Sequence, residues 1–168
     1  MGCKALFIGG IKSGKSKNAE NYILSNALTK PLYLATNEFF DAEMLQRVEK
    51  HKQQRQDKFD TIEEPLQLYN VLKNTDKTVL VECVSMWINN MLYHGYTQED
   101  IFQELALVCT LDNDIVFVIN DVSCSVVSEH ALTRLFVDIN GRVAQYLAAQ
   151  VEEVYQNVAG IVVPIKTT

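Results

Sequence analysis

The chain alternates short apolar runs with longer segments in which hydrophobic residues recur every three to four positions. The apolar runs predict strands, and the most continuous are Val79-Leu80-Val81 and Ile115-Val116-Phe117-Val118-Ile119. Runs without a polar interruption are typical of strands buried on both faces of a parallel sheet. The strands predicted in this way are 5–8, 32–35, 78–82, 115–120, 153–158 and 161–165.

Helices are predicted between these strands. The clearest covers 131–150, because its apolar residues recur at helical spacing and form one stripe that we assign to the core. Asp41 suits the N-cap of the second helix and Glu43 suits its first turn. The predicted helices are 16–26, 41–54, 66–73, 87–93, 98–109 and 131–150.

The order of these elements predicts the fold class. Strands that alternate with helices indicate a three-layer α/β fold with a mainly parallel sheet. Gly160 lies between the last two predicted strands and favours a tight turn, so an antiparallel hairpin is expected at the C-terminal end. The 168-residue length and the lack of a Pro/Gly-rich linker predict a single domain over residues 1–168.

A phosphate-binding loop is predicted directly after the first strand. The segment Gly9-Gly10-Ile11-Lys12-Ser13-Gly14-Lys15-Ser16 fits the pattern G-x-x-x-x-G-K-[ST] and precedes a predicted helix. Its glycines let backbone N–H groups surround phosphate oxygens, Lys15 reaches the β- and γ-phosphates, and the Ser16 hydroxyl holds Mg²⁺. The following helix adds its positive N-terminal end. The predicted fold is therefore similar to P-loop NTPases.

A nucleotide site also needs an acidic residue that helps to hold the metal, often at the end of an apolar strand. Two residues qualify, Glu82 after Val79–Val81 and Asp121 after Ile115–Asn120. We favour Glu82 as the Mg²⁺ ligand beside Ser16. The alternative for either residue is an ordinary acid at the end of a strand.

The second predicted helix carries a cationic face. Arg47, His51 and Arg55 are spaced four residues apart and so share this face, and Lys52 lies beside it. Cationic neighbours favour the neutral, nucleophilic form of an imidazole, and the arginines can neutralise phosphate charge around it. The alternative is a solvated basic face with an incidental histidine. The other histidines, at 94 and 130, have no comparable setting and are assigned to the surface or to loops.

Composition narrows the classes of function. The net charge is −6, from 15 basic and 21 acidic residues, which argues against a nucleic-acid partner. No apolar run approaches the roughly 18 residues of a membrane helix, so no membrane span is expected. The first strand begins almost at once, so no secretory signal is expected and a cytoplasmic location is predicted. The four cysteines lack zinc-ligand spacing and are expected to be reduced thiols.

Taken together, these residues resemble the adenosylcobinamide kinase / adenosylcobinamide-phosphate guanylyltransferase family of cobalamin biosynthesis. The similarity covers nearly the whole chain and rests on several motifs in order. They are Gly9–Ser16, Tyr33-Leu34-Ala35-Thr36, Glu43-Met44 with Arg47, His51-Lys52-Gln53-Gln54-Arg55, Thr61-Ile62-Glu63-Glu64-Pro65, Glu82-Cys83 with Trp87 and Asn89, Arg134-Leu135-Phe136 with Asp138, Gly141-Arg142-Val143 with Gln145, and Gly160 with Lys166.

The resemblance implies a bifunctional enzyme. One activity phosphorylates the aminopropanol hydroxyl of adenosylcobinamide with ATP or GTP, and the other transfers GMP from GTP to the phosphate product through a GMP-histidine, here His51. It also implies a corrinoid substrate, a homotrimer, and nucleotide contacts beyond the phosphate-binding loop. Those contacts are Ala35, Thr36, Asn37, Lys52, Gln53, Gln54, Arg55, Glu63 and Glu82.

The chain departs from the family pattern after the fourth of its predicted strands. The family reads N-E-V-G-x-G-x-V-P, whereas residues 120–128 read N-D-V-S-C-S-V-V-S. Because glycines permit positive φ and close backbone approach, this loop is expected to differ in shape. One alternative is therefore a guanylyltransferase without kinase activity. Others are a small-metabolite P-loop kinase, which has no need of His51, and a nucleotide switch, disfavoured because the chain has no N-K-x-D guanine motif.

Overall fold

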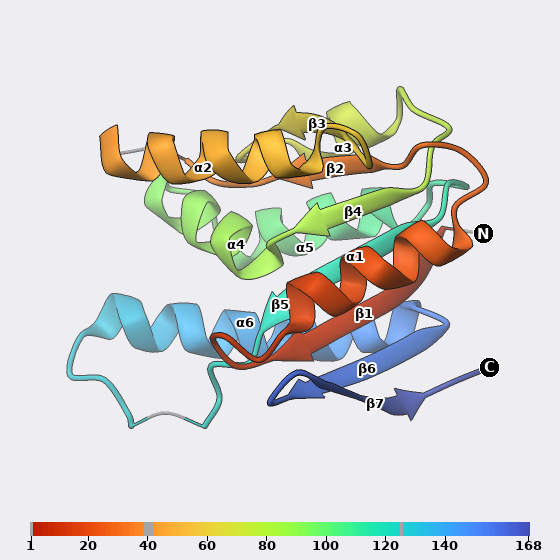
Figure 1. Cartoon of the computed structure of the whole chain (residues 1–168). Helices are drawn as coiled ribbons and strands as arrows, with labels where there is room; N and C mark the ends of the chain where they lie inside the picture. Colours follow the sequence, from red (N-terminus) through yellow and green to blue (C-terminus); the bar gives the residue numbers. More distant parts are fainter. Residues whose placement is uncertain (1, 39–41, 125) are drawn as a thin grey trace.

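The strands form one seven-stranded sheet in the order β3-β2-β4-β5-β1-β6-β7 (Figure 1). The computed structural model describes residues 2–38, 42–124 and 126–168. Every neighbouring pair is parallel except β6 and β7, which form an antiparallel hairpin. The strands are β1 (Cys3–Gly9), β2 (Leu32–Ala35), β3 (Asp60–Glu63), β4 (Val79–Glu82), β5 (Ile115–Asn120), β6 (Glu153–Val158) and β7 (Ile161–Lys166).

Helices cover both faces of the sheet, which gives three layers (Figure 1). On one face lie α1 (Lys15–Asn26) and α2 (Ala42–Arg55); on the other lie α3 (Leu68–Leu72), α4 (Val84–Tyr93), α5 (Gln98–Val108) and α6 (Ala131–Gln150). Alternation along the strands supplies both cores. On β1, Ala5 and Phe7 pack toward α1, while Leu6 packs toward the four helices of the opposite face.

The structure confirms the predicted α/β fold with a mainly parallel sheet and a C-terminal hairpin. One strand was not predicted: β3 is a short edge strand, D-T-I-E, with no apolar run to mark it. Helix α4 begins at Val84, three residues before the predicted start at Trp87, because the turn after β4 leads directly into the helix. Asp41, the predicted cap of the second helix, lies outside the described residues.

Parallel strands bring polar residues together at one edge of the sheet. Gly9, Ala35, Glu82 and Asn120 end β1, β2, β4 and β5, so these four positions share the carboxyl edge. Open α/β sheets bind ligands beyond this edge. In the described parts of the chain, none of the helices has the length and apolar character needed to cross a membrane.

Candidate nucleotide site

The loop between β1 and α1 has the backbone that the phosphate-binding motif requires. Lys12 and Gly14 adopt positive φ, 59° and 88°, which turns the loop back over the end of β1. The Lys15 side chain is buried, and its Nζ donates to the Gly10 carbonyl oxygen at 3.2 Å. The ammonium is therefore held inside the loop, where an anion would meet it together with the N-terminal end of α1.

The C-terminal hairpin supports this loop from outside. The Gly160 N–H donates to the Ser13 carbonyl oxygen at 2.8 Å, and the Asn18 amide donates to Asn157 Oδ1 at 2.9 Å. A Cβ at Gly9 would lie 2.5 Å from Ser13 Oγ and 2.7 Å from the Asn157 carbonyl oxygen, so only glycine fits there. The hairpin thus supports the phosphate-binding loop through direct contacts.

Ser16 and Glu82 meet across the sheet edge. The Ser16 hydroxyl donates to Glu82 Oε1 at 2.8 Å, and Glu82 Oε2 is buried without a hydrogen-bonding partner in the described structure. Burial raises the pKa of Glu82 to about 7, although the Ser16 hydrogen bond and the Lys15 charge act in the opposite direction. A hydroxyl beside a carboxylate that has a free oxygen fits Mg²⁺, which prefers oxygen ligands and completes its shell with phosphates and water.

The raised pKa of Glu82 predicts a pH-dependent stability. The folded state binds the proton more tightly than the unfolded state, so the stabilisation is complete below about pH 4.5 and is lost as pH rises through about 7. Wild type should lose stability over this pH range, whereas Glu82→Gln has no proton to lose at this position. The free energy of unfolding of Glu82→Gln, relative to that of wild type, should therefore rise by at most about 3 kcal/mol between pH 4.5 and 8. Urea unfolding at both pH values, with a chelator present, measures this gain.

A suitable control for that measurement is Glu129→Gln, because Glu129 is exposed and lies beyond the carboxyl end of β5. Its difference from wild type should be similar at both pH values. A Glu82→Gln difference that also stayed constant with pH would contradict the assignment of a buried, proton-binding carboxyl at Glu82.

A cavity of about 320 Å³ opens beside this pair, between α1 and α2. It brings His51 to the same space as Ser16 and Glu82, although His51 lies 35 residues beyond the first and 31 before the second in the chain. The lining residues are Ser16, Lys17, Glu20, Tyr33, Ala35, Asn37, Val48, His51, Arg55, Glu82 and Cys83. The imidazole therefore shares a cavity with the start of α1 and the end of β4.

Arg55 is one of the cationic residues that line this cavity. Its guanidinium stacks on the Tyr33 ring, with the guanidinium carbon 3.8 Å from the ring centroid, and its Nε is buried with no partner among the residues described. Glu20 faces the same region, and burial raises the pKa of its carboxyl while the charge of Arg55 lowers it. A guanidinium held in this way presents fixed positive charge to an anionic ligand.

The remaining predicted residues divide into three groups. Lys52 on α2 and Glu63 at the end of β3 approach each other, with Nζ and Oε1 4.0 Å apart. Gln53 and Gln54 are exposed and do not line the cavity. Arg47 is also outside the cavity, where it pairs with Glu43 on the exposed side of the helix. The cationic face is therefore reduced to His51 and Arg55.

Thr36 has a positional role. Its side chain is fully buried, and Oγ1 donates to the Cys83 carbonyl oxygen at 2.8 Å while it accepts from the Cys83 N–H at 3.0 Å. Asn90 donates to the Thr36 carbonyl oxygen at 2.6 Å. These bonds join the end of β2 to the turn after β4 and so hold Glu82 in place.

Five residues that line the His51 cavity were not predicted from the sequence as site residues, although Glu20 lies one helical turn after Ser16. They are Lys17, Glu20, Tyr33, Val48 and Cys83.

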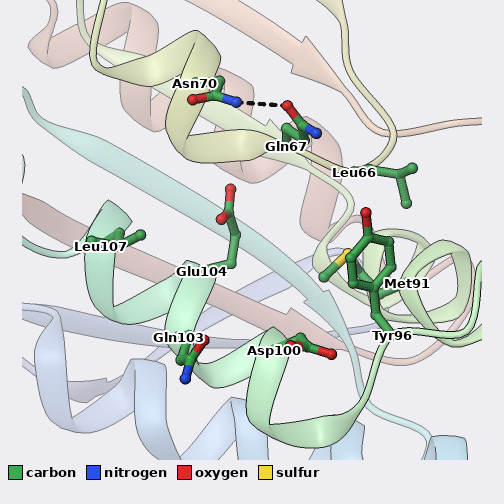
Figure 2. A pocket seen from close by; sticks show the side chains of 9 residues that line it. All are labelled: Leu66, Gln67, Asn70, Met91, Tyr96, Asp100, Gln103, Glu104 and Leu107. Atoms are coloured by element: carbon green, nitrogen blue, oxygen red, sulfur yellow. Dashed lines mark hydrogen bonds between the residues drawn. The ribbon is translucent and has the colours of Figure 1, made fainter.

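A cavity of about 300 Å³ lies elsewhere, between α3 and α5 (Figure 2). Its acidic residues, Glu104 and Asp100, already make hydrogen bonds that stabilise the fold. Glu104 points from α5 toward α3 and accepts from the Tyr69 N–H at 2.8 Å, and Asp100 closes a capping box with Thr97 at the start of α5. None of the predicted nucleotide contacts lines it, so we assign the functional site to the phosphate-binding loop.

Comparisons with known proteins show the family to which the chain belongs. The model of the family described as cobinamide kinase / cobinamide phosphate guanyltransferase matches residues 5–165. The bifunctional adenosylcobalamin biosynthesis protein CobU of Escherichia coli (strain K12) is 36% identical over 180 residues, covering 96% of this chain and 98% of its own. The bifunctional adenosylcobalamin biosynthesis protein CobP of Pseudomonas aeruginosa is 34% identical over 167 residues, covering 96% of each chain.

Solved structures show the fold at much lower identity. A KaiC-like protein from Pyrococcus horikoshii OT3 superposes with a TM-score of 0.52 at 13% identity, over 92% of this chain and 70% of its own. An ATPase of the type III secretion system gives a TM-score of 0.52 at 12% identity, over 91% of this chain and 50% of its own. These neighbours support the P-loop NTPase architecture and carry no further information on function.

Proposed function

Because the chain belongs to the cobinamide kinase / cobinamide phosphate guanyltransferase family, we propose that it is a bifunctional enzyme of cobalamin biosynthesis. It phosphorylates adenosylcobinamide with ATP or GTP and then transfers GMP from GTP to adenosylcobinamide-phosphate through a guanylylated His51. The observation that carries the second step is the cavity in which His51 and Arg55 face Ser16 and Glu82. A nucleotide whose terminal phosphates occupy the Gly9–Ser16 loop would extend toward that histidine.

In the kinase step the chain supplies position and charge. The backbone of Gly10–Gly14 surrounds the terminal phosphates, and the buried Lys15 ammonium neutralises charge on the transferred group. Ser16 and Glu82 would hold Mg²⁺, which would neutralise phosphate charge. This reaction requires no covalent bond to the protein.

In the guanylyltransfer step His51 is the nucleophile. A ring nitrogen forms a bond to the α-phosphorus of GTP as the bond to the bridging oxygen breaks, and pyrophosphate leaves with the electron pair. The phosphate oxygen of the corrinoid then attacks the same phosphorus and releases His51. Arg55 lies on the same cavity wall, so its guanidinium can balance charge on the phosphorus during both displacements.

The other nucleotide contacts follow from the same placement. Ala35 and Asn37 line the cavity at the end of β2, whereas Lys52 and Glu63 pair with each other and are not among its lining residues. Thr36, Gln53 and Gln54 complete the nucleotide contacts that we carry over from the family.

The corrinoid is the acceptor in both reactions. We also infer a homotrimer in the cytoplasm, without a nucleic-acid partner.

A trapping experiment tests this function. Wild-type protein incubated with Mg²⁺ and GTP labelled at the α-phosphate should retain label after denaturation. The label should be lost in acid and kept in base, as expected for a phosphoramidate. Transfer of γ-label from ATP or GTP to cobinamide tests the kinase half separately. An unlabelled protein would contradict the covalent step.

The altered loop at 120–128 favours a second candidate, a guanylyltransferase that has lost kinase activity. The same pair of labels separates the two. Covalent α-label together with no γ-transfer to cobinamide would select the guanylyltransferase alone, whereas both signals would select the bifunctional enzyme.

The contact between Arg55 and Tyr33 predicts a selective effect on His51. Helix α2 has no buried side chain, so this stacking is a principal anchor for the turn that carries the histidine. A cation–π contact contributes about 0.5–2 kcal/mol, so Tyr33→Leu should slow labelling of His51 by roughly 2- to 30-fold, with a smaller change in γ-transfer. Tyr33→Phe retains the ring and should label at nearly the wild-type rate. Equal slowing by both variants would contradict the role of the ring.

A further inference from the structure

The end of β5 is placed between the two parts of the nucleotide site. In the sheet β5 lies between β1, which leads into the phosphate-binding loop, and β4, which ends in Glu82. Asn120 pairs in register with Gly9, and the Asp121 N–H donates to the Gly9 carbonyl oxygen at 2.8 Å. Asp121 therefore lies against the first residue of the loop that would hold the terminal phosphate.

A buried hydrogen-bond frame fixes this position. Ser85 Oγ donates to Asn140 Oδ1 at 2.6 Å and accepts from the Asn120 N–H at 3.0 Å. Asn140 Nδ2 donates to the Asn120 carbonyl oxygen at 2.9 Å. Because Ser85 and Asn140 are almost fully buried, α4 and α6 both hold the end of β5 rigidly. The backbone before Asp121 is thus preorganised.

The Asp121 side chain is oriented as well. Its Oδ1 accepts from the Ser123 N–H at 3.0 Å and from the Ser123 hydroxyl at 2.5 Å. Asp121 also lines a cavity of about 240 Å³ between this turn and α6, together with Ile8, Asn140 and Gln145. Asp121 therefore borders a cavity that no step of the proposed mechanism has used.

This cavity and the His51 cavity lie on opposite faces of the sheet. The His51 cavity is walled by α1 and α2, whereas the Asp121 cavity is walled by α6. The phosphate-binding loop crosses the sheet edge between them. Phosphoryl transfer places the attacking and leaving oxygens roughly in line across the phosphorus. If the nucleotide binds on the side of α1 and α2, the side of α6 remains free for the acceptor.

We propose that Asp121 is the general base of the kinase step and that the acceptor hydroxyl enters through the cavity beside α6. This inference rests on the proposed kinase activity. The bond from the hydroxyl oxygen to the γ-phosphorus forms, the bond to the β–γ bridging oxygen breaks, and the nucleoside diphosphate leaves with the electron pair. The hydroxyl proton passes to the Asp121 carboxylate. Glu82 remains with Ser16 at the metal position, so the two strand-end acids have different tasks.

The test compares two reactions in one variant. Asp121→Asn retains a side-chain oxygen for Ser123 but removes the base. Transfer of γ-label to cobinamide should fall by about 10²-fold in kcat, with little change in KM for the nucleotide, while α-labelling of His51 stays near wild type. Asp121→Glu restores a carboxylate and should recover much of the lost rate. Asp76→Asn, an exposed acid at the amino edge of the sheet, is the matched control.

Each outcome decides the inference. Equal loss of both reactions in Asp121→Asn, or γ-transfer at the wild-type rate, would overturn it. A wild-type protein that labels His51 but transfers no γ-phosphate would also overturn it, and would leave the guanylyltransferase half of the proposed function intact. If γ-transfer depends on Asp121 while His51 takes no label, the inference stands and the covalent step of the proposed function fails.

Discussion

Replacement of His51 by asparagine should abolish covalent attachment of GMP and leave phosphoryl transfer to cobinamide within about tenfold of wild type. An amide cannot serve as the nucleophile, and loss of a covalent nucleophile lowers a rate by on the order of 10⁴-fold or more. The kinase reaction is spared because Lys15 and Ser16 belong to the phosphate-binding loop and Glu82 ends β4, so none of the three lies on α2. The variant should also fold normally, since His51 is exposed and α2 buries no side chain.

The measurement is the amount of acid-labile α-label on denatured protein, with γ-transfer as the internal standard. His130→Asn serves as the matched control, because that histidine is exposed at the N-cap of α6 and lines neither the His51 nor the Asp121 cavity. Undiminished label on His51→Asn would place the nucleophile elsewhere and would contradict the proposed role.

Replacement of Lys15 by methionine should impair both reactions, in contrast to the His51 variant. Methionine has similar length and suits a buried position, but it lacks the charge that stabilises a departing pyrophosphate or a transferred phosphoryl group. Loss of one preorganised electrostatic contact of this kind costs about 10²–10³-fold, and we expect the upper end because Lys15 Nζ is buried in the loop. Labelling of His51 and γ-transfer should therefore both fall by about 10³-fold.

Thermal unfolding of the Lys15 variant separates a catalytic loss from a folding defect, and its Tm should not fall. Lys73→Met provides a control, because this exposed lysine stands at the end of α3, away from the loop. If either reaction retained its normal rate in Lys15→Met, the common role of the ammonium in both steps would be wrong.

The elements with strong local signals were predictable. The uninterrupted apolar residues of β4 and β5 indicated central parallel strands, and the periodic stripe of α6 indicated a helix packed on the sheet. The phosphate-binding loop was predictable because glycine, lysine and serine at that spacing serve one kind of chemistry. In contrast, β3 is an edge strand without a fully buried residue and contains two acids, so its strand conformation depends on pairing with β2.

The functional side chains were only partly predictable. Helical spacing alone indicated a common face for Arg47, His51 and Arg55, but Arg47 turns toward Glu43 and stays outside the cavity. Spacing defines a face of a helix and cannot define what that face meets. The aromatic ring under Arg55 comes from Tyr33, which is distant in sequence and lies in a strand motif that does not by itself indicate this contact.

The sequence by itself determined that this chain forms a mainly parallel α/β sheet and carries a phosphate-binding loop after its first strand. It also determined that the chain contains the ordered motifs of a known protein family. Those conclusions rest on local periodicity and on residue types at short spacings. Only the tertiary structure decided which distant residues share a space. The strand order β4-β5-β1 brings Glu82 to Ser16 and Asp121 to Gly9, and the crossing of α2 over β2 brings His51 to the same edge. Long-range pairing sets these contacts, and it results from burial of both faces of the sheet rather than from any short stretch of chain.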